Sequence, residues 1–296
     1  MNTTQPRVGV IGIGNMGLGI ALRLREQGLA VTVRDVDATR DALARAGGCC
    51  VAASPAELAA GCDLVFVVVV DASQARDVLF GGDGATAALR PGCGVVLCPT
   101  IAPGDVEALA ADLLRHGIDV IDAPMSGGPV RAREGRMSLM VAGADAVVDR
   151  WLPLLQRMAD PVIRVSARPG DGARTKLVNN LLAAINLMGA SEVLALATRL
   201  GLDPSRTLDV IESSSGQSWI GSNRLRRALA GDEEPQAHMA LLAKDSALAM
   251  DEVRRIGAPA PLGAAASAGF AQAVAHGLAR ADDSALYRWL LQAPPG

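Results

Sequence analysis

A glycine-rich loop between an apolar strand and a helix constrains the fold of this chain most. Residues 7–13 predict a strand that runs into Gly12, Gly14 and Gly17, and residues 18–27 predict the helix that follows. The spacing Gly-x-Gly-x-x-Gly is weak evidence alone, but a strand before it and a helix and second strand after it are typical of a dinucleotide-binding unit. Gly12 permits the tight turn, Gly14 lets the backbone approach a pyrophosphate, and Gly17 lets helix and strand pack closely. The loop residues predicted to bind the dinucleotide are Gly12, Ile13, Gly14, Asn15, Met16 and Gly17.

An acidic residue closes the second predicted strand, which covers residues 30–34. Asp35 stands where a carboxylate accepts both ribose hydroxyls of an adenosine and repels a 2′-phosphate. This placement favours NAD over NADP as the cofactor. Arg34 and Arg40 lie close enough in sequence to leave some tolerance for NADP. The alternative is that Asp35 is an ordinary turn residue.

The order of apolar segments predicts two domains of different class. Strands at 62–70, 94–98, 118–123, 138–143 and 161–165 alternate with helices, and most are continuous apolar runs of the kind buried on both faces of a parallel sheet. A long helix over residues 172–201 follows, and only helices come after it. Aromatic residues make up only 2% of the chain, so its apolar content lies in Ala, Val and Leu, which suits helices and buried strands. We therefore expect an α/β Rossmann-type domain with a parallel-rich sheet at 1–168 and an all-α domain at 169–296, begun by the long central helix.

Two sets of polar or glycine residues interrupt this pattern at positions suited to a substrate-binding or catalytic site. Ser126, Gly127 and Gly128 follow a predicted strand, at the edge where open parallel sheets bind ligands, and their N–H and hydroxyl groups suit a carboxylate. Lys176 and Asn180 are four residues apart and share one face of the long helix. They form a candidate active-site pair; the alternative is a solvated first helical turn.

Lys244 and Asp245 lie together inside another apolar helix, over residues 238–257. The alternative to a functional role for them is an ion-paired surface turn.

Composition and charge argue against a nucleic-acid-binding, secreted, membrane-spanning or metal-binding protein. A net charge of −3 without a basic stripe gives no footprint for nucleic acid. Residues 1–7 do not form a signal or transit peptide, and the longest purely apolar run, 64–70, is far shorter than a membrane span. The five cysteines are odd in number and lack a Cys-x-x-Cys pair or a nearby histidine, so we expect reduced buried thiols in a cytoplasmic protein and no metal site.

Four motifs together resemble the β-hydroxyacid dehydrogenases, the family of 3-hydroxyisobutyrate dehydrogenase. They are the glycine loop, Asp122-Ala-Pro-Met-Ser-Gly-Gly, Lys176-Leu-Val-Asn-Asn180 and Lys244-Asp245, in that order and across nearly the whole chain. The resemblance implies that Lys176 is the general acid/base and that Asn180 orients the substrate oxygen. It further implies that Ser126, Gly127 and Gly128 hold the substrate carboxylate. Lys244 and Asp245 would close the site from the helical domain, with Lys244 in contact with substrate and cofactor and Asp245 in contact with the cofactor. The resemblance also implies a homodimer or homotetramer.

Departures from the family pattern concern the cofactor side. Val69-Val70 stand where many relatives have Leu-Pro, and Thr100 follows a proline where they have a Ser-Thr pair. These residues are expected to line the cofactor. The carboxy-terminal half is most similar to the L-threonate dehydrogenase branch, through stretches at 216–219, 223–224, 244–245 and 282–285. We therefore expect NAD-dependent oxidation of a small 3-hydroxy acid, with four-carbon sugar acids such as L-threonate ahead of 3-hydroxyisobutyrate.

Four alternatives stay open at this point. The enzyme could be a 3-hydroxyisobutyrate dehydrogenase, or the same machinery could run in reverse as a semialdehyde reductase acting on tartronate or succinic semialdehyde. It could be an imine reductase, although those relatives typically lack the lysine at 176. It could also be a catalytically silent dinucleotide-binding module, against which Lys176, Asn180 and Ser126 argue together.

Overall fold

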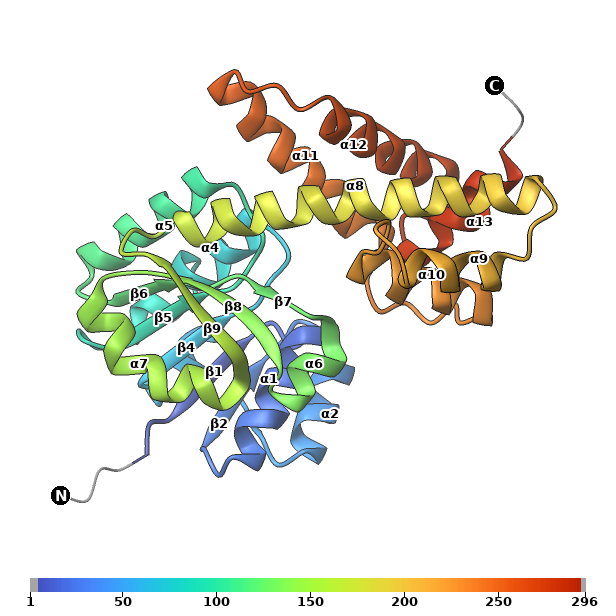
Figure 1. The fold of residues 1–296 in the computed structure, drawn as a ribbon. Helices are drawn as coiled ribbons and strands as arrows, with labels where there is room; N and C mark the ends of the chain where they lie inside the picture. Colours follow the sequence, from blue (N-terminus) through green and yellow to red (C-terminus); the bar gives the residue numbers. More distant parts are fainter. Residues whose placement is uncertain (1–4, 294–296) are drawn as a thin grey trace. The chain divides into compact units, whose positions relative to one another are not determined.

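The computed structural model describes residues 5–293, so residues 1–4 of the stretch tested for a targeting segment lie outside the described part. The chain forms two compact units, Met1–Lys176 and Leu177–Gly296. The division falls inside one long helix, α8 (Asp171–Arg199), labelled in Figure 1. Each unit is described below by itself.

The first unit is built on a mixed sheet. In the described residues it has nine strands in the order β3-β2-β1-β4-β5-β6-β8-β7, with β9 paired to β8. The strands from β3 to β6 are parallel, β8 runs antiparallel to β6 and β7, and β9 is parallel to β8. Their bounds are β1 (Val8–Ile11), β2 (Val31–Arg34), β3 (Cys50–Val51), β4 (Leu64–Val67), β5 (Gly94–Leu97), β6 (Asp119–Asp122), β7 (Met125–Ser126), β8 (Met137–Ala142) and β9 (Ala159–Ser166).

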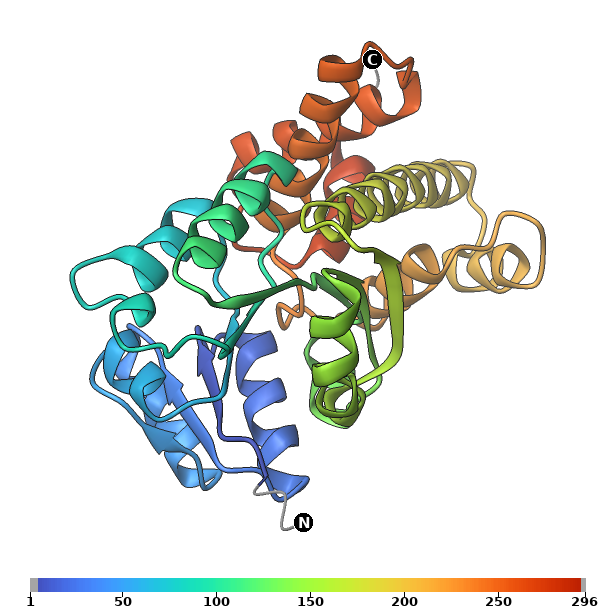
Figure 2. The ribbon, with the colours of Figure 1, turned by 90° about the vertical axis from the view of Figure 1, so that its left-hand side faces the viewer.

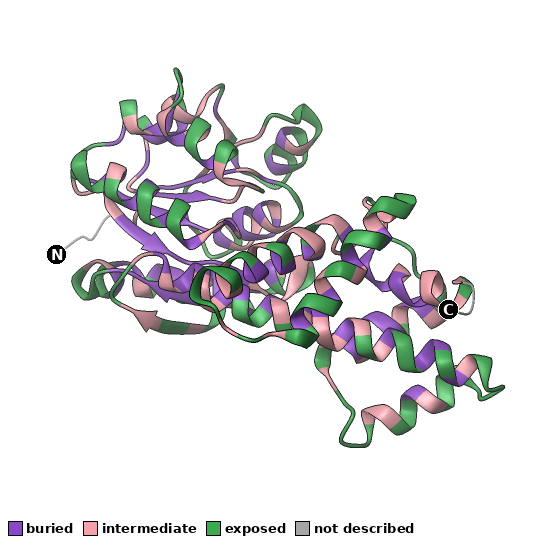
Figure 3. Ribbon diagram, turned by 90° about the horizontal axis from the view of Figure 1, so that it is seen from above, coloured by how far each residue is buried: buried purple, intermediate pink, exposed green. Residues whose placement is uncertain are grey.

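Helices cover both faces of this sheet (Figure 2). The helices of this unit are α1 (Asn15–Glu26), α2 (Ala38–Ala46), α3 (Pro55–Ala60), α4 (Ala72–Phe80), α5 (Pro103–Arg115), α6 (Gly128–Glu134) and α7 (Asp145–Met158), with a 3-10 turn at Ala85–Ala87. One core lies between the sheet and α1, α2 and α7, the other between the sheet and α3, α4 and α5. The central strands β1, β4 and β5 are buried along their whole length, as Figure 3 shows in purple. This burial explains their continuous apolar sequences.

The second unit consists of helices in its described part, apart from one isolated bridge between His238 and Asp282. After α8 come α9 (Pro204–Glu212), α10 (Trp219–Ala230), α11 (Met239–Ile256), α12 (Pro261–Ala273) and α13 (Leu286–Gln292), with short turns at Val274–Leu278 and Asp283–Ala285. Leu187, Phe270 and Leu286 are fully buried at the centre of one of its cores. The predicted fold class, a Rossmann-type domain followed by an all-α domain that a long helix begins, is confirmed.

Three local expectations differ from the structure. The segment around Ser126 is not only a loop, because β7 and the helix α6 occupy it. The last helical stretch, which the sequence predicts as one helix over residues 263–277, is broken: α12 stops at Ala273, an irregular turn with Gly277 at a φ of 91° follows, and α13 comes after it. The thiols of Cys49, Cys62, Cys93 and Cys98 are buried and unbridged, but Cys50 is exposed at the short edge strand β3.

Helix α8 is apolar on average, although polar residues prevent it from forming one uninterrupted apolar run. It is long and apolar enough, by length and composition, to cross a membrane, and a third of its most apolar window is buried inside the chain. The helix contains the polar residues Lys176, Asn180 and Glu192. Burying charged or polar side chains in lipid costs free energy, so such residues are rare in a lipid-facing helix. Core helices of globular proteins pass the same test of length and composition, so the property is weak evidence for a membrane span.

Candidate active site

The glycine loop has the geometry that a dinucleotide requires. Gly12 adopts a φ of 86°, and a Cβ atom there would stand 2.5 Å from the carbonyl oxygen of Val68. A Cβ on Gly17 would stand 2.0 Å from the carbonyl oxygen of Gly12, whereas one on Gly14 would meet open space. Gly14 is also the N-cap of α1, so the first N–H groups of the helix face that space. The loop therefore fits a bound pyrophosphate, and NAD(P) supplies hydride acceptance when it is bound there.

Asp35 is tied to this loop by hydrogen bonds. Its Oδ2 accepts from the backbone N–H of Ile13 at 2.6 Å, and its Oδ1 accepts from that of Asp37 at 2.9 Å. The neighbouring arginines are both engaged: Arg34 pairs with Asp41 at 3.4 Å, and Arg40 donates to Asn15 Oδ1 at 3.1 Å. A carboxylate therefore stands beside the loop, while the cations near it already have partners.

Residues predicted to line the cofactor and substrate lie at one edge of the sheet. Val69 and Val70 follow β4, and Thr100 follows β5, both at carboxyl ends of parallel strands. Ser126 closes β7, where it pairs with Ser138 of β8. These positions meet at the edge where open parallel sheets bind ligands.

The two glycines after Ser126 turn the chain from β7 into α6. Gly127 and Gly128 have φ values of 131° and 77°, which side chains other than glycine rarely adopt. A Cβ on Gly128 would meet nothing within 4 Å, so its backbone borders open space. This is the geometry expected of a carboxylate nest, with the N–H groups at the start of α6 beside it.

Lys176 lies in the second turn of α8 and is buried, with only 7% of its surface exposed. Asn180, one helical turn further, is 9% exposed. The alternative of a solvated first turn is therefore wrong. A long cationic side chain is rarely buried unless its amine has a specific role.

Asn180 is held in a polar cluster of the second unit. Its amide donates to Asp245 Oδ2 at 2.7 Å, and its carbonyl oxygen accepts from Asn179 at 3.0 Å. The other carboxylate oxygen of Asp245 lies 2.8 Å from Lys244 Nζ. The structure thus brings Asn180, Lys244 and Asp245 together, and α11 contributes the last two. Asp245 is buried, so the pair is more than an ion-paired surface turn.

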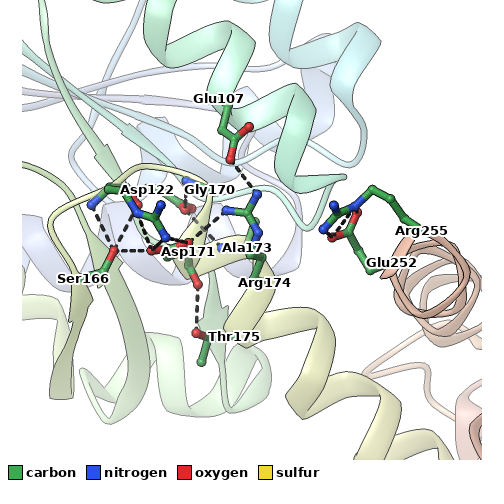
Figure 4. A network of polar contacts seen from close by, with 11 residues as sticks. Glu107, Asp122, Ser166, Gly170, Asp171, Ala173, Arg174, Thr175, Glu252 and Arg255 are labelled. Carbon is green, nitrogen blue, oxygen red and sulfur yellow. Dashed lines mark hydrogen bonds and ion pairs between the residues drawn. The ribbon is translucent and has the colours of Figure 1, made fainter. Parts of the chain in front are cut away.

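The start of α8 is fixed by a network that sequence reasoning missed (Figure 4). Asp122, the last residue of β6, is 1% exposed, and its Oδ2 accepts from the N–H groups of Gly170 at 2.7 Å and Ala173 at 3.1 Å. Burial raises the pKa of Asp122 to about 6, although these backbone hydrogen bonds oppose the shift. The signal available in the sequence was a carboxylate ending an otherwise apolar strand.

Asp171, the first residue of α8, carries the exposed part of the same network. It accepts from Ser166 Oγ at 2.7 Å and from Arg174 at 2.9 Å, and Arg174 reaches Glu107 of α5 at 2.6 Å. The hydrogen bond from Ser166 and those from the arginines hold the pKa of Asp171 below its usual range. An anionic side chain in the first turn also suits the positive end of the helix dipole.

A second network, inside the helical unit, was also missed. Arg224 of α10 pairs with the buried Asp283, and Arg227 pairs with Asp282 at 3.0 Å. Burial would raise the pKa of Asp282, but hydrogen bonds from Ser284, Arg227 and the backbone lower it to about 2. Burial raises the pKa of Asp283 to about 6. The pairs link the end of α10 to the segment before α13.

The use of lysine in this chain is selective. Of 28 lysines and arginines, only two are lysines, and these are Lys176 and Lys244. Surface ion pairs elsewhere use arginine throughout, for example Arg226 with Glu212. Arginine stays protonated in proteins, whereas a buried lysine can lose its proton near neutral pH. Lys176 is therefore one of only two residues of the chain that carry an amine side chain.

Comparison with known proteins places both units in one family. Residues 7–167 match the NAD-binding domain of 6-phosphogluconate dehydrogenase, and residues 170–290 match the NAD-binding model of NADP-dependent 3-hydroxyisobutyrate dehydrogenase. An L-threonate dehydrogenase from Cupriavidus necator is 39% identical over 282 residues, 95% of each chain.

Solved structures agree with this placement. A 3-hydroxyisobutyrate dehydrogenase from Salmonella typhimurium is 35% identical with a TM-score of 0.90, covering 96% of this chain and all of that one. A protein described as Psf3, solved with NADP⁺ and 2-OPP, is 30% identical with a TM-score of 0.89, covering 96% and 99%. An imine reductase from Streptomyces aurantiacus is 21% identical with a TM-score of 0.66, covering 96% and 99%, and shares the fold alone.

The raised pKa of Asp122 makes a prediction about stability. Because the folded-state pKa of about 6 lies above the ordinary 3.8, the ionised carboxylate costs stability above pH 6, and this cost disappears below about pH 4. We expect the free energy of unfolding of the wild type, relative to Asp122→Asn, to fall by about 2.4 kcal/mol from pH 4 to pH 7. Denaturant unfolding of both proteins at several pH values measures this difference. Asp283, whose pKa burial also raises, is present in both proteins, so its contribution to the pH dependence cancels. A difference that does not change with pH would contradict it.

Proposed function

Because the chain belongs to the β-hydroxyacid dehydrogenase family, and is thus an NAD(P)-binding oxidoreductase acting on CH–OH groups, we propose that it oxidises a small 3-hydroxy acid with NAD⁺. The favoured substrate is a four-carbon sugar acid such as L-threonate. Two of the stretches that resemble the L-threonate dehydrogenase branch are joined in the structure, since Arg224 pairs with Asp283. The relatives named L-threonate dehydrogenase support the same choice.

The buried amine of Lys176 is the observation that carries this proposal. In the oxidation, NAD⁺ held at the glycine loop would accept the hydride that the C–H bond of the alcohol gives up. The O–H bond breaks as well, Lys176 Nζ accepts the proton, and the carbonyl double bond forms. Desolvation in general disfavours a charged ammonium, and Lys176 is only 7% exposed.

The remaining site residues bind the substrate and orient it. Ser126 and the N–H groups of Gly127 and Gly128 hold the substrate carboxylate. Asn180 orients the substrate oxygen, and its amide is itself oriented by Asp245 at 2.7 Å. Lys244 lies 2.8 Å from that aspartate and would contribute positive charge to the binding of substrate and cofactor.

Lys176→Arg tests the proton-transfer role, because arginine keeps the charge but does not lose its proton. We expect turnover of L-threonate with NAD⁺ to fall about 10²–10⁴-fold while NADH affinity is retained. Lys244→Arg is the matched control: it preserves the cation that this second lysine supplies and is expected to retain most of the turnover. NAD⁺ reduction followed by absorbance, with NADH binding followed by fluorescence, gives both quantities.

A panel of substrates separates the alternatives. L-threonate, D-threonate, D-erythronate, 3-hydroxyisobutyrate and D-glycerate test oxidation, and tartronate and succinic semialdehydes test the reverse reaction with NADH. Turnover of 3-hydroxyisobutyrate alone would make the protein a 3-hydroxyisobutyrate dehydrogenase, and turnover of a semialdehyde alone a reductase. NADH binding with no turnover of any member would support the catalytically silent module and overturn the proposal.

The cofactor preference rests on Asp35. Its carboxylate would face the adenosine ribose, and Arg34 and Arg40 are engaged with Asp41 and Asn15 and thus do not offer a free cation to a 2′-phosphate. NAD is therefore proposed as the preferred cofactor, with NADP used less well.

Asp35→Asn removes the charge and keeps an acceptor for the N–H of Ile13. The ratio of kcat/KM for NAD⁺ to that for NADP⁺ is expected to fall by at least about tenfold, since a like-charge repulsion is lost. Asp37→Asn, an exposed acid in the same turn that caps α2, is the control and should leave the ratio within about twofold. Equal shifts in both variants would show that only the general charge of the turn matters.

The exposed face of α8 supports a homo-oligomer, either a dimer or a tetramer. Four large apolar residues of the helix, and Leu200 directly after its end, are between 49% and 72% exposed; the four are Val178, Leu182, Val193 and Leu196. Their spacing of three, four and eleven residues places them on one stripe. We propose that a second copy of the chain covers this stripe. The unbridged thiols fit the reducing cytoplasm, which we propose as the compartment.

Light scattering after gel filtration tests the oligomer. Leu182→Glu combined with Leu196→Glu would bury unpaired charges in the interface, so the species should fall to one chain of 30.4 kDa. The control is Leu262→Glu on α12, a residue that is 68% exposed and outside the stripe, and it should leave the mass unchanged. A wild type that is already monomeric would contradict the proposal.

A further inference from the structure

The start of α8 is held by a side chain from outside the helix. Asp122 extends from the end of β6 and accepts hydrogen bonds from the N–H groups of Gly170, the residue before α8, and Ala173 in its first turn. N–H groups at a helix start have no partner within the helix. Some other helices of this chain use a local cap; for example, Asp203 begins α9 by accepting from Ser205 and Arg206. In α8 the cap is distant in sequence, so it ties the helix to the sheet.

Gly172 allows this contact to form. A Cβ atom on Gly172 would stand 2.9 Å from Asp122 Cγ and 2.7 Å from the carbonyl oxygen of Met140 on β8. The face of α8 that carries Gly172 therefore lies directly against the ends of β6 and β8. The absence of a side chain at 172 is what permits this close approach.

Lys176 lies on the same face of the helix as Gly172, because residues four apart are neighbours along an α-helix. Side chains of helical residues also lean toward the amino terminus of their helix. The Lys176 side chain is thus directed over the turn that Asp122 caps, and it is buried there. Any displacement of that turn moves the amine with it.

We propose that Asp122 is a positioning residue of the hydride-transfer reaction: its carboxylate fixes the first turn of α8 and so sets the place and the charge environment of the Lys176 amine. This inference rests on the proposed function for the role of Lys176. Asp122 does not itself exchange a proton with the substrate.

The cost of this arrangement supports the proposal. Asp122 is an ionised group in a site that is 99% enclosed, and burial raises its pKa, so a neutral cap would be the more stable choice. Two other titratable groups face it. The Cys98 thiol at the end of β5 stays protonated because burial raises its pKa, and Asp171 is paired with Arg168 and Arg174. Asp122 is therefore a buried acidic group that is held by backbone N–H groups of the helix start.

Kinetics of Asp122→Ala tests the positioning role. Because a misplacement near 1 Å costs a catalytic group about 10²-fold, we expect kcat to fall about 10²-fold, with the Kd for NADH within about twofold of the wild type. Asp203→Ala removes the matched cap from α9, which carries no site residue, and kcat should stay within about twofold. A merely structural role would instead lower stability in both variants and leave kcat per folded molecule unchanged, which would overturn the proposal.

A double-mutant cycle shows whether Asp122 acts through Lys176. In the Lys176→Ala background, Asp122→Ala should lower the residual kcat by no more than about threefold, because the group that it positions is gone. Two losses that multiply fully would mean that Asp122 affects turnover by another route, and the proposal would be wrong.

The scarcity of lysine provides a readout that does not need turnover. Labelling lysine with ¹³C at Cε gives only two side-chain resonances, those of Lys176 and Lys244. In Asp122→Asn, which keeps the size and an acceptor oxygen, the loss of a negative charge should move the Lys176 titration to lower pH by about half a pH unit or more. The Lys244 titration should stay in place as an internal reference.

The two outcomes separate this inference from the proposed function. If no hydroxy acid is oxidised but the Lys176 titration shifts alone, the proposed function fails and the link between Asp122 and Lys176 stands. If Lys176→Arg loses turnover but the Lys176 resonance is unchanged in Asp122→Asn, the inference about Asp122 fails alone. Should Asp122→Ala not fold, Asp122→Asn supplies both the kinetic and the spectroscopic comparison.

Discussion

The place of the long helix α8 in the first unit depends on two hydrogen bonds from its opening turn to one buried carboxylate. Asp122 stands at the end of a central strand, and it accepts from Gly170 and Ala173 where an isolated helix would leave these donors to water. Gly172 lets the helix approach closely enough for this contact. Because Lys176 follows one turn later, the contact couples the sheet to the amine on which the proposed proton transfer relies. A buried charge is costly for stability, and its retention beside the site is the kind of local conflict expected at functional positions.

The cofactor side depends on glycine in a similar way. Gly12 and Gly17 are positions where a Cβ atom would strike backbone, and Gly14 is a position where it would fill the space open to a ligand. Asp35 then joins the loop to the end of β2 through the N–H of Ile13, so the residue proposed to select the ribose also shapes the phosphate turn. If Asp35 has that role, the preference between NAD and NADP and the order of the loop are set by the same side chain.

Much of the fold follows from local sequence signals, and the exceptions have physical reasons. The glycine loop, the apolar runs of β1, β4 and β5 and the long helix were predictable because each signal is strong over several residues. The helix α6 was not, because Gly127, Gly128 and Pro129 are typical of a turn and only a short helix follows them. The burial of Lys176 and the contacts of Asp122, Arg224 and Asp283 could not be predicted either, since they join residues distant in sequence. The candidate site residues came from motifs, but the interactions that hold them required the structure.

Chemical rescue tests most directly whether Lys176 transfers the proton. Lys176→Ala leaves room for a small amine, so methylamine, ethylamine and weaker bases of similar size can be added to this variant in turn. If Lys176 is the general base, hydroxy acid oxidation should recover with added amine, and the recovered rate should rise with the basicity of the amine at constant free-base concentration. The same amines should leave the wild-type rate unchanged. Absence of rescue by any amine, in a variant that still binds NADH, would contradict the assignment of the proton transfer to Lys176.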